Sequence, residues 1–123
     1  MRVADFVIKF LKDKGIKNVF TVSGGGSIFL CDALYKSKKL NYVSCHHEQA
    51  VSFATESYSR VKNKPGAAII TTGPGGTNCT TGVACCWIDS VPSIFISGQV
   101  YLNQTIKNTG LRQLGVQEFD IVS

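Results

Sequence analysis

The chain has 123 residues, of which 44% are hydrophobic and 17% charged, and its formal net charge is +5. This length predicts one domain with its own core, and the composition excludes the low hydrophobicity of disordered chains. No apolar run is long enough for a transmembrane helix, and the N-terminus lacks the apolar stretch of a signal peptide. The positive charge comes from scattered lysines, which indicate a solvated surface rather than a nucleic-acid interface.

Helical and strand-like patterns alternate along the first 97 residues. A helix over 2–14 is predicted from the helical spacing of an apolar face made of Val3, Phe6, Val7, Phe10 and Leu11. Further helices are predicted over 28–35, 50–61 and 77–88, and strands over 18–22, 40–44, 67–72 and 93–97. Apolar strands that alternate with helices predict an α/β fold, a doubly wound and mostly parallel sheet with helices on both faces.

Three unusual stretches follow predicted strands. Residues 23–27 and 73–76 are rich in glycine, and residues 45–50 read CHHEQA. In open parallel sheets, ligands bind beyond the carboxyl ends of the strands, so these stretches form the candidate site. Neither glycine segment completes a dinucleotide-binding or phosphate-binding fingerprint, and each taken alone indicates only a tight turn and close packing of the next helix.

The CHHEQA segment contains one residue of particular interest, Glu48. The neighbours His46 and His47 would diverge by roughly 100° on a helix or 180° on a strand, which argues against a shared metal ion. Glu48 precedes small apolar residues at a strand-to-helix corner, where an apolar crevice would strengthen its hydrogen bond to a protonatable ligand nitrogen. The alternative is a surface glutamate that stabilises the start of a helix.

Five cysteines have neither metal-ligand spacing nor the pattern of a disulfide framework. They are Cys31, Cys45, Cys79, Cys85 and Cys86. We interpret them as small, buried apolar side chains in a reducing compartment, which predicts a cytoplasmic protein.

Four long segments carry a family resemblance, at 19–34, 46–66, 71–100 and 111–122. Their motifs, including HHEQA and GPGGTN, resemble in order and spacing the N-terminal, pyrimidine-binding domain of thiamine-diphosphate-dependent enzymes. Within that family the chain is most similar to acetolactate synthase large subunits. The resemblance implies decarboxylation of a 2-oxo acid, with or without ligation to a second carbonyl compound.

The resemblance also implies roles for single residues. Glu48 matches the glutamate that hydrogen-bonds the N1′ nitrogen of the cofactor's aminopyrimidine and so activates the cofactor. Gln117 matches a glutamine that faces the reaction centre, and His47 is expected to orient or shield Glu48. Further cofactor contacts are expected from Pro74, Asn78, Gly24, Gly25 and Gly26. The family usually has proline at the position of Ser23, and this departure leaves the choice of 2-oxo acid open.

The family's magnesium ion and cofactor diphosphate are held by a second domain, whose Gly-Asp-Gly motif does not occur here. We therefore expect residues 1–123 to be a single, incomplete domain of a dimeric enzyme, inactive without a diphosphate-binding domain from another chain or from a missing C-terminal part. FAD is a second cofactor in part of the group. Two alternatives stay open: a non-catalytic dimerisation module that keeps the surface around Trp87, and one half of a split enzyme.

Overall fold

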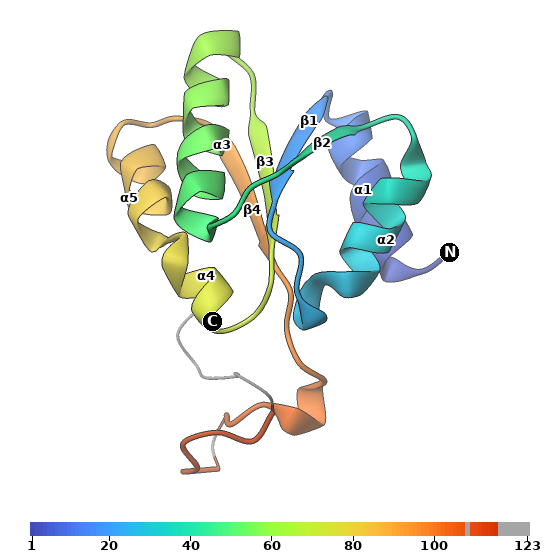
Figure 1. Cartoon of the computed structure of the whole chain (residues 1–123), viewed down its shortest axis with the longest axis vertical. Helices are drawn as coiled ribbons and strands as arrows, with labels where there is room; N and C mark the ends of the chain where they lie inside the picture. Colours follow the sequence, from blue (N-terminus) through green and yellow to red (C-terminus); the bar gives the residue numbers. More distant parts are fainter. Residues whose placement is uncertain (108, 116–123) are drawn as a thin grey trace.

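The computed structural model describes residues 1–107 and 109–115, and its centre is a four-stranded parallel sheet (Figure 1). The strands are β1 (Asn18–Thr21), β2 (Asn41–Ser44), β3 (Gly66–Ile70) and β4 (Ser93–Ser97), in the spatial order β2-β1-β3-β4. The helices are α1 (Val3–Asp13), α2 (Ile28–Ser37), α3 (Glu48–Lys62), α4 (Pro74–Asn78) and α5 (Thr80–Ile88). Short 3-10 turns follow β1 and β4, at Gly25–Ser27 and Leu102–Gln104.

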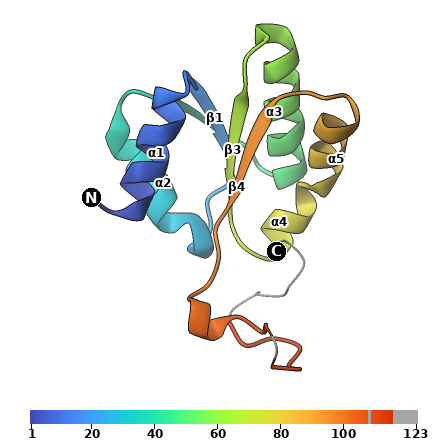
Figure 2. The ribbon, with the colours of Figure 1, turned by 180° about the vertical axis from the view of Figure 1, so that it is seen from behind.

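Helices cover both faces of the sheet, as the α/β prediction requires. Helices α1 and α2 lie on one face and α3, α4 and α5 on the other, and the view from behind shows the same layers (Figures 1 and 2). The central strand β3 is buried along its whole length. Because successive strand residues point to opposite faces, Ala67 and Ile69 pack in the core under α1 and α2, and Ala68 and Ile70 pack under α3.

The predicted buried face of α1 is wrong in part. Leu11 is buried as expected, but its partners in the core are Ala4 and Ile8. Phe6 and Phe10 instead lie on the outside, with 55% and 43% of their surface exposed. Apolar residues occupy more than one stripe of this helix, so periodicity alone could not decide which stripe packs against the sheet.

Three further expectations need correction. The second glycine segment is not a loop throughout, because Pro74 begins α4, where its fixed φ suits the first helical position. The helix predicted over 77–88 is therefore divided at Cys79 into α4 and α5. The edge strand β2 is exposed along its length rather than covered on both faces.

Helices α3 and α5 pack against each other at Gly82. A Cβ atom there would lie 2.2 Å from Ser52 Oγ and 2.4 Å from Ser52 Cβ, so only glycine fits this contact. We expect Gly82→Ala to lower the free energy of unfolding by about 1–3 kcal/mol through overpacking, despite the better helix propensity of alanine. Urea denaturation measures the change. The matched control is Gly25→Ala, whose Cβ would meet no atom within 4 Å; equal midpoints for the two variants would contradict the close contact.

Candidate functional site

The three unusual stretches meet at one edge of the sheet, where all four strands end. This edge lies at the bottom of Figure 1, with the start of α3, the start of α2 and α4 around it. The glycine segment after β1 contacts the segment after β3, because the Gly26 amide donates a hydrogen bond to Thr71 Oγ1 at 3.1 Å. The segment after β3 in turn contacts the first residue of α3, Glu48, through α4.

The neighbours of Glu48, His47 and Gln49, form the N-terminal cap of α3 and so fix the position of Glu48 at the start of this helix. His47 is the N-cap of α3, and its Nδ1 accepts a hydrogen bond from the Gln49 amide at 3.1 Å. The cap therefore belongs to His47, and Glu48 follows it in the first turn of the helix, where the helix dipole favours a negative charge. Glu48 is half-buried, while His46 and His47 are exposed.

The Glu48 carboxylate has one oxygen bound and one oxygen open. Asn78 Nδ2, at the end of α4, donates a hydrogen bond to Oε2 at 2.9 Å. Oε1 accepts no hydrogen bond from the residues that the structure describes, and it faces Gly75: a Cβ atom there would lie 3.4 Å from Oε1. The same Cβ atom would lie only 2.6 Å from Thr71 Cγ2, so only glycine lets this backbone pack between Thr71 and the carboxylate.

Thr71 lies between the two glycine segments, and the sequence pattern did not single it out. A Cβ atom on Gly24 would approach Thr71 Cβ to 2.6 Å, and a Cβ atom on Gly75 would approach Thr71 Cγ2 to 2.6 Å. The Thr71 carbonyl also accepts a hydrogen bond from Ser97 Oγ at 3.0 Å. Glycine is therefore required on both sides of this β-branched side chain. The sequence offers only one signal that could have pointed to Thr71, namely a threonine at the end of a central strand and next to a glycine segment.

A cavity of about 370 Å³ opens beside Thr71. It is lined by Gly25, Gly26, Phe29, Thr71, Thr72, Gln99, Val100 and Tyr101. Of the residues predicted to bind a cofactor, Gly25 and Gly26 line this cavity. Glu48 and Asn78 lie together outside it, Pro74 is exposed at the start of α4, and Gln117 falls outside the described residues. The sequence prediction did not include Gln99, whose Oε1 accepts a hydrogen bond from Thr72 Oγ1 at 2.8 Å.

Two further kinds of feature, a group of metal-binding side chains and a membrane-spanning helix, are absent from residues 1–107 and 109–115. No three His, Cys, Asp or Glu side chains there come together as a group that could hold a metal ion. No helix in the same residues has the length and apolar character needed to cross a membrane.

Cys79 forms a hydrogen bond with the backbone of Glu48. Its Sγ donates a hydrogen bond to the Glu48 carbonyl at 3.1 Å, and the side chain is 1% exposed. Burial, with a smaller effect of the Glu48 charge, raises the pKa of the Cys79 thiol from 9.0 to about 12. A thiol with this pKa stays protonated at neutral pH, so Cys79 acts as a structural donor and not as a nucleophile.

The raised pKa of Cys79 predicts a pH dependence of stability. Above pH 9 the unfolded chain releases the thiol proton while the folded chain keeps it, so stability is lost as the pH rises from about 9 toward 12. Between pH 8 and 10 we expect the wild type to lose on the order of 1 kcal/mol more than Cys79→Ser, which keeps a donor without this ionisation. Urea denaturation at the two pH values measures the difference, and parallel losses in the two proteins would contradict the assignment.

Comparison with known proteins identifies the family. Residues 1–123 match the family model described as the thiamine pyrophosphate enzyme, N-terminal TPP binding domain. An acetolactate synthase large subunit of Buchnera aphidicola is 39% identical over 97 residues, which cover 79% of this chain and 17% of the relative. The chloroplastic acetolactate synthase of Arabidopsis thaliana is 42% identical over 97 residues, which cover 79% of this chain and 14% of the relative.

A third relative, the acetolactate synthase isozyme 3 large subunit of Escherichia coli, is 37% identical over 97 residues, which again cover 79% of this chain and 17% of the relative. The chain thus spans less than a fifth of the length of these curated relatives. Both the family match over the whole chain and these identities lead to the same assignment. The chain belongs to the thiamine pyrophosphate enzymes and corresponds to their N-terminal thiamine-pyrophosphate-binding domain.

Proposed function

We propose that this domain binds the aminopyrimidine ring of thiamine diphosphate and presents Glu48 to its N1′ nitrogen, as part of an acetolactate-synthase-like enzyme that acts on a 2-oxo acid. When bound, the cofactor supplies the carbon atom that reacts with the carbonyl group of the substrate. The chain's own contribution is to position the ring and to hold a carboxylate against one of its nitrogens.

The observation that carries this proposal is the asymmetric carboxylate of Glu48. Asn78 binds Oε2 at 2.9 Å, and Oε1 accepts no hydrogen bond from the residues that the structure describes. A carboxylate held in this way can accept one further hydrogen bond, and a protonated ring nitrogen is a suitable donor. Because Oε1 accepts no hydrogen bond from the described residues, it remains available to a ring nitrogen, so the residues present fit the N1′ side of the cofactor's pyrimidine.

The other predicted contacts extend the proposal. Gly24, Gly25 and Gly26 are proposed to line the mouth of the site, and of these Gly25 and Gly26 line the 370 Å³ cavity. Asn78 supports Glu48 and is proposed as a positioning residue rather than as a wall of the pyrimidine site. Pro74 is proposed to contact the cofactor, and Gln117 to face the reaction centre.

Magnesium and the cofactor diphosphate would bind a second domain that carries the Gly-Asp-Gly motif. A dimeric assembly, FAD as a second cofactor and a cytoplasmic location stay predictions from the sequence.

An exposed apolar surface on α5 supports an interaction with another protein domain. On α5, Trp87 and Ile88 are 85% and 76% exposed, and cavities of about 420 and 480 Å³ beside Trp87 share Val83 and Phe95 in their walls. We propose that a diphosphate-binding domain or a second copy of the chain covers this surface. The same surface favours the second candidate function, a dimerisation module without catalysis. Calorimetry separates the two, because the module would bind protein but not thiamine diphosphate.

The direct test of the catalytic proposal is Glu48→Gln in a complex reconstituted with a diphosphate-binding domain. The amide cannot serve as the carboxylate does toward N1′, so we expect exchange of the cofactor's C2 proton to slow by at least about 100-fold, measured by NMR. The control is Glu56→Gln, which removes one negative charge from the same helix, where Glu56 pairs with Arg60. Exchange at the wild-type rate in Glu48→Gln would contradict the role of Glu48.

A further inference from the structure

A further cavity, of about 270 Å³, is lined by residues of α1, of α2 and of the turn after α2. Both helices lie on the opposite side of the sheet from α3 (Figures 1 and 2). Its apolar floor consists of Ile8, Ala33 and Leu40, each at most 5% exposed. Its rim carries four lysines, Lys9, Lys12, Lys36 and Lys39, together with Asp5 and Ser37. The cavity has no residue in common with the candidate cofactor site.

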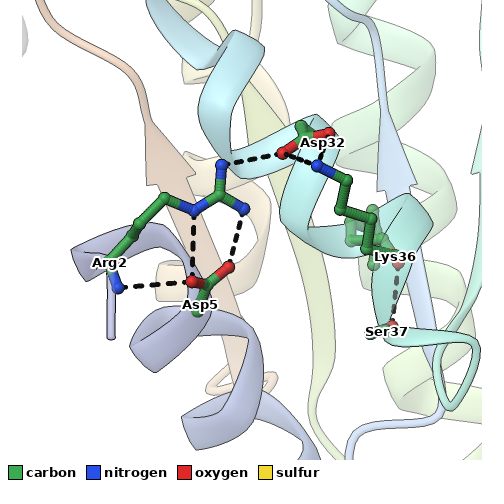
Figure 3. Close-up of polar contacts among 6 residues, drawn as sticks. Arg2, Asp5, Asp32, Lys36 and Ser37 are labelled. Carbon is green, nitrogen blue, oxygen red and sulfur yellow. Dashed lines mark hydrogen bonds and ion pairs between the residues drawn. The ribbon is translucent and has the colours of Figure 1, made fainter.

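The acidic groups around this cavity are already paired. Arg2 lies between the two helices and binds both Asp5 and Asp32, each at 2.8 Å (Figure 3). Lys36 also binds Asp32, at 2.9 Å, and Lys9 pairs with Asp13.

Two of the rim lysines lie outside these ion pairs, and Lys12 acts on Asp13 only as a weaker charge beside the hydrogen-bonded Lys9. In the described part of the chain, Lys12 and Lys39 form no ion pair within 4 Å. The five cations and three acids of this cluster leave a net charge of two, and the unpaired lysines carry it over an apolar floor.

The net positive charge of the chain comes from the segment that forms α1 and α2. Residues 1–41 contain eight Lys and Arg but only three Asp, whereas residues 42–123 contain five charges of each sign. The whole net charge of +5 therefore belongs to the segment that forms α1, β1 and α2. The lysines looked scattered along the chain, but the parallel packing of α1 and α2 brings Lys9 and Lys12 to the same cavity as Lys36 and Lys39.

We propose that the cavity between α1 and α2 binds a small organic dianion, a phosphate monoester with a short apolar body. The charge of about −2 on such a phosphate matches the two unpaired lysines, and lysine binds phosphate as a mobile point charge. The apolar floor provides a surface for the organic part, and the volume is sufficient for one small ring, since a cavity of about 150 Å³ already holds benzene. This site is independent of the thiamine diphosphate site and of the function proposed for it.

The test is a titration of the chain with phenyl phosphate, followed by NMR at about 0.15 M salt. Inorganic phosphate supplies the charge alone, and benzyl alcohol supplies the ring alone. We expect saturable binding of phenyl phosphate, with an affinity at least about tenfold above that of either comparison ligand, because the charge and the ring act together. No saturable binding of phenyl phosphate, or equal affinity for inorganic phosphate, would overturn the proposal.

Variants separate the cavity from general attraction to a basic protein. Lys12→Gln with Lys39→Gln removes the two unpaired charges at exposed positions, and we expect phenyl phosphate affinity to fall at least about tenfold. The matched control is Lys62→Gln with Lys64→Gln at the far end of α3, which changes the net charge equally and should keep the affinity. An equal loss in both double variants would assign the binding to net charge and contradict a site between α1 and α2. Circular dichroism verifies that both variants are folded.

Discussion

The parallel direction of all four strands is the constraint from which the candidate site follows. It brings the segments after β1, β2 and β3 to one edge of the sheet, although a helix and a strand separate each from the next in the sequence. At that edge Thr71 fills the space between two glycine segments, and neither Gly24 nor Gly75 has room for a side chain beside it. The glycines are thus explained by packing, because they let the segments after β1 and β3 approach Thr71 closely at the edge where Glu48 lies.

The hydrogen bond between Asn78 and Glu48 orients the carboxylate relative to these packed segments. Asn78 ends α4 and Glu48 begins α3, so the bond fixes the carboxylate relative to the segment after β3. Cys79 holds the backbone of Glu48 through a neutral, buried thiol. The carboxylate is therefore oriented by neighbouring groups before any ligand binds, which lowers the cost of ordering it in a complex.

The sequence predicted the fold class and the position of most elements, because strand and helix periodicities differ and glycine and proline mark the turns. It also predicted that Glu48 and the glycine segments lie at one edge, since this follows from a parallel sheet. It could not predict the partner of Glu48, because the bond to Asn78 joins residues thirty positions apart and depends on how α4 packs. The buried stripe of α1 and the lysine cavity were missed for the same reason: each depends on contacts between separate elements.

The central claim is that Asn78 acts on the cofactor only through Glu48. The most direct measurement is C2 proton exchange in the Asn78→Ala variant of a reconstituted complex, at saturating thiamine diphosphate. Loss of one hydrogen bond to a charged group predicts exchange that is about tenfold slower, with the affinity for thiamine diphosphate nearly unchanged. Exchange at the wild-type rate, or a loss of affinity without slower exchange, would contradict the account and would favour Asn78 as a direct contact of the cofactor.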